Sequence, residues 1–182
     1  MSEVVSTRLS GVFSDDRATQ GRAYQSLLQE TDGPVDWAYE VWDDLIEALG
    51  HKDNHVRSIA AQLLCNLSRS DPEARILGDF DALLAVTRDE RFVTARHCLL
   101  ALWKIGLAGE AQKRRLVEGL AGRFEACAAE KNVTLIRFDV VQGLRKLYDR
   151  VKDESIRETA LGLIATESDA KYRKKYSGVW KT

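Results

Sequence analysis

Proline is scarce in this chain, which has only Pro34 and Pro72 among its 182 residues. A β-rich domain of this length normally needs more turns built on proline and glycine, and more runs of β-branched residues. Leucine, alanine, glutamate, arginine and lysine dominate instead, and all five favour helices. The composition therefore argues against a β sandwich or barrel and predicts an all-helical fold.

Long apolar segments are also missing. The longest run of note, Cys98–Trp103, has six residues, which is far too short to span a membrane. The first residues, Met1–Val5, lack the basic region and long apolar core of a signal peptide. The three cysteines are odd in number and widely spaced within apolar helical patterns, as expected in a reducing compartment. We therefore expect a cytoplasmic protein that does not enter a membrane.

Neither sign of charge is in excess. The chain has 27 basic and 28 acidic residues, a net charge of -1 and a pI near 6.3. A protein that binds nucleic acid or anionic lipid over its whole surface is usually basic. Any such binding here would have to come from local patches.

Signatures of catalysis and of metal or cofactor binding are absent as well. The sequence has no phosphate-binding glycine loop, no dinucleotide-binding glycine pattern and no Gly-x-Ser-x-Gly nucleophile turn. His51 and His55 are four residues apart, but a turn lies between them and no further ligand is apparent. His97 and Cys98 are adjacent, so they point in different directions on a helix. We expect no enzyme activity, no cofactor and no metal.

Apolar residues recur at helical spacing along nearly the whole chain. The segment Asp36–Gly50 has one apolar stripe, and Gly50 is a natural stop for its helix. Asp53 or Asn54 is then placed to cap the next helix. The predicted helices are Asp16–Gln29, Asp36–Gly50, the helix after Asp53, Phe80–Thr87, Phe92–Leu107, Glu110–Ala129, Val133–Arg150, Glu154–Thr166 and Lys171–Tyr176.

An internal repeat connects these helices. Lys52–Leu64 aligns without gaps on Lys152–Ile164, and weaker copies surround Arg96 and Arg137. The arginines at 57, 96, 137 and 157 are separated by 39, 41 and 20 residues. The first two spacings are close to the period of helical-repeat proteins, and the last indicates a lone terminal helix. A single helix pair cannot bury its own apolar stripe, so repetition serves packing first.

The repeated pattern is an acidic residue, Val or Ile followed by Arg, then Ala, then Leu and a further aliphatic residue. It resembles the second helix of HEAT repeats over about residues 36–166. The resemblance implies a right-handed α-α superhelix of about four helix pairs with a capping terminal helix. It predicts one domain over 1–182, with N-terminal cap helices in 1–35, repeats in 36–167 and a basic, aromatic tail in 168–182. It also implies a ladder of hydrogen bonds between repeats, to which Asp53, Arg57, Asp153 and Arg157 would contribute.

The first candidate surface is a row of arginines on the concave face of the predicted superhelix. Its members are Arg57, Arg96, Arg137 and Arg157. Such a row has two interpretations, an anion-binding stripe or the structural ladder between repeats. We favour the ladder, because an arginine already paired with an aspartate has little capacity left for a phosphate.

The second candidate surface is an acidic ridge on one side of the helix at 36–50. It consists of Asp36, Glu40, Asp43, Asp44 and Glu47. Like charges at this spacing weaken a helix slightly, so the ridge could serve a basic partner. A solvated outer face is the alternative that we favour.

The third candidate surface is the C-terminal tail, which combines cations with aromatic residues. Its candidate binding residues are Lys171, Arg173, Lys174, Lys175 and Trp180. Segments of this kind suit nucleic acids. Tyr172, Tyr176 and Trp180 are also four residues apart, which favours a helix that covers the last repeat.

We expect a non-enzymatic scaffold that presents a concave helical surface to another protein. The alternative is a DNA-binding protein, because HEAT-like folds include the alkylpurine DNA glycosylases. This chain resembles those enzymes in architecture alone, since none of their catalytic positions can be matched to it and its charge is near neutral. A third hypothesis is a subunit that chaperones a cofactor or an enzyme partner.

Overall fold

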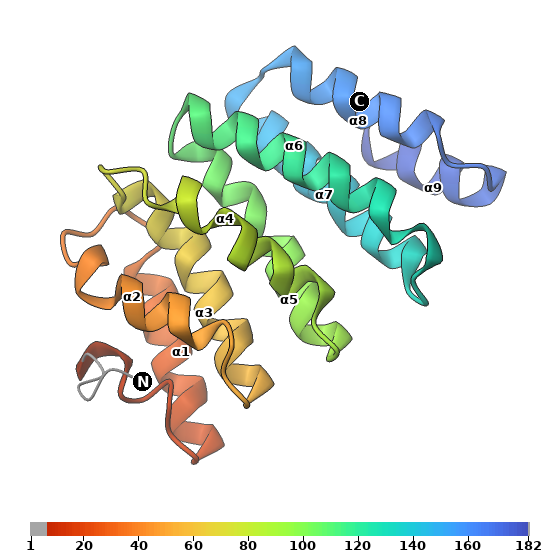
Figure 1. Cartoon of the computed structure of the whole chain (residues 1–182). Coiled ribbons are helices and arrows are strands. Elements are labelled where there is room, and N and C mark those ends of the chain that lie inside the picture. Colours follow the sequence, from red (N-terminus) through yellow and green to blue (C-terminus); the bar gives the residue numbers. More distant parts are fainter. Residues whose placement is uncertain (1–6, 182) are drawn as a thin grey trace. The chain divides into compact units, whose positions relative to one another are not determined.

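The structure is a computed structural model that describes residues 7–181, and its regular elements over that range are all helical (Figure 1). This confirms the predicted all-α, solenoid-type fold. The chain forms two compact units, unit 1 up to Ala101 and unit 2 from Leu102. Residues 1–6 and 182, part of the predicted N-terminal cap and tail, lie outside the described residues. The division into 1–35, 36–167 and 168–182 stays a prediction.

Over its described residues, 7–101, unit 1 contains five α-helices, with α3 at the centre. Helix α3 packs against α1, α2 and α5, so it is the element around which the unit is assembled. The bounds are η1 Thr7–Leu9, α1 Arg17–Glu30, α2 Ala38–Ala48, α3 Asn54–Leu67, η2 Ser68–Ser70, α4 Ile76–Ala85, η3 Val86–Arg88 and α5 Phe92–Ala101. The predicted apolar stripe of α2 is buried, with Val41, Trp42 and Leu45 at most 1% exposed.

Unit 2 contains the remaining helices. The bounds are η4 Leu102–Leu107, α6 Glu110–Ala126, η5 Cys127–Ala129, α7 Val133–Val151, α8 Glu154–Ala165 and α9 Ala170–Val179. The prediction of one helix over Phe92–Leu107 is wrong, because the α-helix ends at Ala101 and η4 is a tighter 3-10 helix. Gly106 lets η4 pack closely on its neighbours, since a Cβ there would lie 2.7 Å from Leu147 and 3.2 Å from Leu116.

Aspartates begin four of the helices. Asp16, Asp53, Asp153 and Asp169 each precede a helix in extended conformation and accept a hydrogen bond from its first turn. Such caps satisfy N–H groups that have no partner within the helix. The predicted cap at Asp53 is therefore confirmed, and its counterpart in the matching copy, Asp153, has the same role.

Helix α9 contacts α7 and α8 through the aromatic residues that the sequence spaces four apart. Tyr176 is fully buried, and its hydroxyl donates to the carbonyl oxygen of Thr134 at 2.9 Å. Trp180 is 7% exposed and lies 5.5 Å from the Tyr148 ring. These contacts are those of a helix that covers its neighbours. Within residues 7–181, no helix has the length and apolar character needed to cross a bilayer.

Candidate functional site

A groove of about 310 Å³ lies on unit 1, where side chains of α1, α3 and α5 meet. Its volume is within the range of protein ligand sites. The lining residues are polar in majority and include no carboxylate. They are Arg17, Gln20, Gly21, Tyr24, His55, Ser58, Ile59, Gln62 and His97.

A chain of hydrogen bonds crosses the groove from α1 to α5. The hydroxyl of Tyr24 donates to Gln62 Oε1 at 2.8 Å, and Gln62 Nε2 donates to Ser58 O at 3.1 Å and to Ser58 Oγ at 3.3 Å. Ser58 Oγ in turn lies 3.0 Å from His97 Nδ1. Burial raises the pKa of Tyr24, although the Gln62 hydrogen bond opposes the shift. These hydrogen bonds connect α1, α3 and α5 through polar side chains that a partner could also contact.

Burial lowers the pKa of the His97 imidazole below its ordinary value, and the positive charges of Arg96 and His55 act in the same direction. His97 is therefore biased towards the neutral form when the groove is empty. A negatively charged group placed beside it would reverse that bias, because an opposite charge favours the protonated ring.

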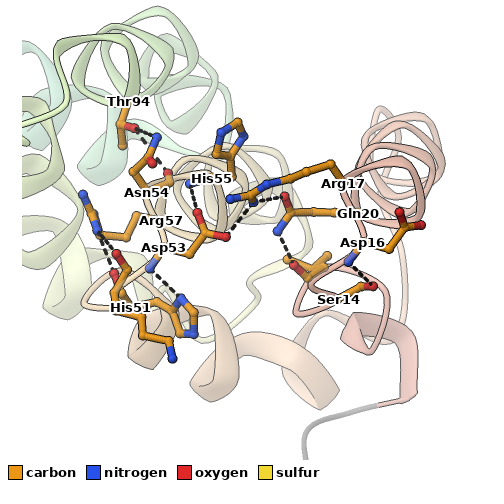
Figure 2. A network of polar contacts seen from close by, with 12 residues as sticks. Ser14, Asp16, Arg17, Gln20, His51, Asp53, Asn54, His55, Arg57 and Thr94 are labelled. Atoms are coloured by element: carbon orange, nitrogen blue, oxygen red, sulfur yellow. Dashed lines mark hydrogen bonds and ion pairs between the residues drawn. The ribbon is translucent and has the colours of Figure 1, made fainter.

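Arg17, which lines the groove, forms an ion pair with Asp53 (Figure 2). Arg17 Nη1 donates to Gln20 Oε1 at 2.8 Å and to Asp53 Oδ2 at 2.6 Å, so one nitrogen contacts both partners. The other oxygen of Asp53 accepts the backbone N–H of His55 at 2.9 Å. Burial opposes a low pKa at Asp53, but the hydrogen bonds from Arg17 and His55 hold it below its ordinary value. The carboxylate thus has both of its oxygens engaged.

The matching copy in unit 2 has a similar arrangement. Asp153 Oδ2 accepts from Lys113 Nζ at 2.5 Å, and Asp153 Oδ1 caps α8 at Ser155 N. The Lys113 ammonium is the main cause that lowers the pKa of Asp153 to about 2. The two aspartates of the repeated pattern therefore pair with cations 36 and 40 residues earlier, Arg17 and Lys113.

The predicted arginine row is mostly engaged within the protein. Arg57 Nε and Nη2 donate to the two oxygens of Asp89 at 2.6 and 2.8 Å, and Nη1 donates to His51 O at 2.8 Å. Arg137 forms an ion pair with Glu167 at 2.8 Å and lies over the Phe124 ring.

The other two members of the row differ from these. Arg157 is half exposed and pairs with Glu154 of its own helix at 3.3 Å, an ordinary surface contact. Arg96 is half-buried on α5, where its charge acts on His97. The groove therefore contains none of the four arginines of the predicted row.

Arg57→Ala is expected to lower the free energy of unfolding by about 2–3 kcal/mol, because Asp89 would remain buried without its charged partner. Urea unfolding followed by circular dichroism measures this loss. Arg91→Ala is the matched control, since Arg91 is exposed and contributes its backbone N–H to Asp89 rather than its guanidinium. Equal stabilities of the two variants would contradict the structural role of Arg57.

The predicted acidic ridge lies on α2 and just before it, and cations from other segments reach it. Arg8 lies 3.5 Å from Glu40, and Arg75 forms an ion pair with Asp43. Asp36, Glu40, Asp43 and Glu47 are exposed, and Asp44 is half-buried. Its role in binding a basic partner stays a proposal.

The cations of the predicted tail lie on α9. Lys171, Arg173, Lys174 and Lys175 are exposed, whereas Trp180 is buried. Arg173 donates to Glu167 O at 2.8 Å, and the Lys175 ammonium lies 4.5 Å from the centre of the Phe138 ring. Trp180 therefore contributes to packing, and binding by the exposed cations stays a proposal. Elsewhere in residues 7–181, no cluster of three or more metal-ligating side chains is present.

The prediction from sequence missed the groove, although the repeat contained a signal for it. Its pairs are separated by one period: 36 residues for Arg17 and Asp53, 38 for Tyr24 and Gln62, and 39 for Ser58 and His97. Polar residues one period apart would have pointed to this face. The recurrence of arginine alone does not point to this face, because Tyr24, Gln62 and His97 are residues of different types.

No family model and no curated protein matches the chain. Solved helical-repeat structures do. A designed armadillo repeat protein in complex with the peptide (KR)4 is 14% identical, with 97% of this chain and 87% of that chain covered and a TM-score of 0.52. A second designed armadillo repeat protein is 15% identical over 97% and 88%, with a TM-score of 0.51. An engineered protein is 17% identical over 95% and 85%, with a TM-score of 0.50. At these identities the likeness concerns the fold, and the chain has an armadillo/HEAT-like helical-repeat architecture.

Proposed function

We propose that this protein is a non-enzymatic scaffold that binds an extended segment of another protein in the groove across α1, α3 and α5. The observation that carries the proposal is the lining of that groove. It combines one aliphatic side chain, Ile59, with amides and hydroxyls from α1 and α3. A chain in extended conformation presents N–H and C=O groups at regular intervals, and side chains of this kind can pair with them.

The polar side chains of the groove have capacity beyond their internal bonds. An amide has two donor hydrogens and two acceptor lone pairs, and a hydroxyl has one donor and two lone pairs. Gln62 Oε1 accepts from Tyr24, and Gln20 Nε2 donates to Val12 O at 2.8 Å. These contacts fix the orientation of both amides before a partner arrives, which reduces the entropy lost on binding. The structural neighbour that holds a peptide is consistent with this use of the fold.

Selection from a random-sequence peptide display library, with the full chain as bait, tests the proposal. The affinity of the enriched peptides is then measured by fluorescence anisotropy. Gly21 offers a blocking variant, because it lines the groove and a Cβ added there meets nothing within 4 Å. Gly21→Trp is expected to weaken peptide binding at least about tenfold by filling the groove, a loss typical of an obstructed contact.

Gly162→Trp is the matched control. Gly162 is likewise a helical glycine with nothing within 4 Å of an added Cβ, but it is exposed and belongs to α8 of unit 2. We expect it to leave the affinity unchanged, and circular dichroism shows whether both variants keep their helices. No enrichment of peptides, or equal binding by Gly21→Trp and the unsubstituted chain, would overturn the proposal.

A further inference from the structure

The groove of unit 1 contains an arginine and two imidazoles whose nitrogen atoms are not all used in hydrogen bonds. Arg17 contacts both of its partners through Nη1, so its Nε and Nη2 have no partner within residues 7–181. The ring of His55 has none over the same range, and that of His97 uses Nδ1 alone. Figure 2 shows the Arg17 guanidinium beside Asp53 and His55, where α1 meets the start of α3.

No carboxylate lines the same groove. Asp53 touches Arg17 from outside the lining, and its two oxygens are engaged by Arg17 and by the first turn of α3. Because Asp53 offsets the permanent charge of Arg17, additional positive charge must come from the imidazoles. The charged and titratable groups around His97 are Arg96 on its own helix and His55 on α3.

We infer that the segment bound in this groove is acidic, and that it places an oxyanion of a side chain between Arg17, His55 and His97. The inference rests on the proposed peptide-binding function and specifies its partner. Arginine offers a planar fork that suits carboxylates and phosphates. An imidazole supplies a second donor to the same anion and becomes a stronger one when protonated.

A peptide accounts for these features better than a nucleic acid does. Backbone binding of nucleic acids needs several permanent cations in a row. The groove has one, Arg17, which is already ion-paired, and the lining offers Tyr24 as its sole aromatic ring apart from the imidazoles. A single oxyanion on a chain that is otherwise neutral matches this arrangement.

The display selection distinguishes the inference from the proposed function. We expect the enriched peptides to contain aspartate or glutamate, and replacement of that residue by Asn or Gln to weaken binding about tenfold. A phosphoserine at the same position tells whether the carboxylate or the phosphate is the preferred oxyanion. Enriched peptides that are neutral or basic would overturn the inference and leave the proposed function standing, whereas no enrichment would overturn both.

A double-mutant cycle locates the anion. Arg17→Gln is expected to weaken the acidic peptide about tenfold but to leave the Gln form of the peptide nearly unaffected, so the two losses are not additive. Arg22→Gln is the matched control, because Arg22 is an exposed arginine of α1 outside the groove lining. Additive losses, or equal effects of the two substitutions, would place the anion elsewhere.

Proton uptake tests the role of His97. Burial lowers the pKa of His97, and an anion bound beside the ring would raise it, so we expect binding to take up protons. Affinity should therefore rise as the pH falls from about 8 to about 6. Calorimetry in buffers of different ionisation enthalpy measures the uptake, and His97→Gln should reduce it. Binding that is independent of pH, or a single-stranded oligonucleotide that binds more tightly than the peptide and loses affinity with Gly21→Trp, would overturn the inference.

Discussion

Trp42→Ala is expected to lower the free energy of unfolding by about 3–5 kcal/mol, the range for removal of a large buried aromatic side chain. Trp42 is fully buried, and its ring lies edge-on to Tyr39 with the centroids 5.9 Å apart. Its indole N–H donates to Asp79 Oδ2 on α4 at 2.8 Å. The substitution therefore leaves a cavity under α2 and also removes a hydrogen bond to a carboxylate. Urea unfolding followed by circular dichroism measures the loss.

Trp42→Phe separates the two contributions. Phenylalanine retains most of the ring but has no N–H, so the expected loss is about 1–2 kcal/mol, mainly for the bond to Asp79. Asp79→Asn keeps an acceptor at this position, so it should lower the free energy of unfolding by less than Trp42→Phe does. If Trp42→Ala cost no more than Trp42→Phe, the ring would not be part of the packed core of unit 1.

The sequence predicted the helices well wherever local signals acted alone. Apolar spacing located the stripe of α2, and the predicted cap at Asp53 or Asn54 is made by Asp53. Local signals failed at the end of α5, where the apolar run continues past Ala101 but the backbone tightens to a 3-10 helix. Within η4, Gly106 packs so closely that an added Cβ would lie 2.7 Å from Leu147, a tertiary constraint that helical periodicity does not reveal.

The candidate site was harder to predict, because most of its lining side chains are polar but uncharged, whereas the surfaces predicted from the sequence consist mainly of charged residues. Arg57 and Arg137 attracted attention as parts of a repeat, but the structure pairs both with carboxylates that are largely buried. Arg17 belongs to no clear copy of the repeat, yet it keeps donors available at the groove. Which arginines remain available depends on partners distant in the sequence, such as Asp89 and Glu167, so it could not be read from spacing.

Arg123 is a buried arginine that no pattern in the sequence singled out. It lies within α6 between the buried Leu120 and Phe124, and its side chain is fully buried. Its Nη1 and Nη2 donate to the two oxygens of Glu130 at 2.7 and 2.8 Å. Arg123→Ala is expected to lower the free energy of unfolding by about 2–4 kcal/mol, mainly because the volume of a fully buried side chain is lost, whereas the Glu130 side chain is 36% exposed and can be solvated in part. The fork geometry explains why a lysine at this position should not restore the full stability.

Arg114→Ala is the matched control for Arg123→Ala. Arg114 is an exposed arginine of the same helix, so its loss should change the stability by less than about 0.5 kcal/mol. Arg123→Lys keeps the charge but offers one nitrogen in place of two, and we expect an intermediate loss of about 1–2 kcal/mol. The order Arg114→Ala, Arg123→Lys, Arg123→Ala in increasing loss follows from a paired guanidinium in the interior of unit 2. If Arg123→Ala were no more costly than Arg114→Ala, the ion pair with Glu130 would contribute nothing to folding.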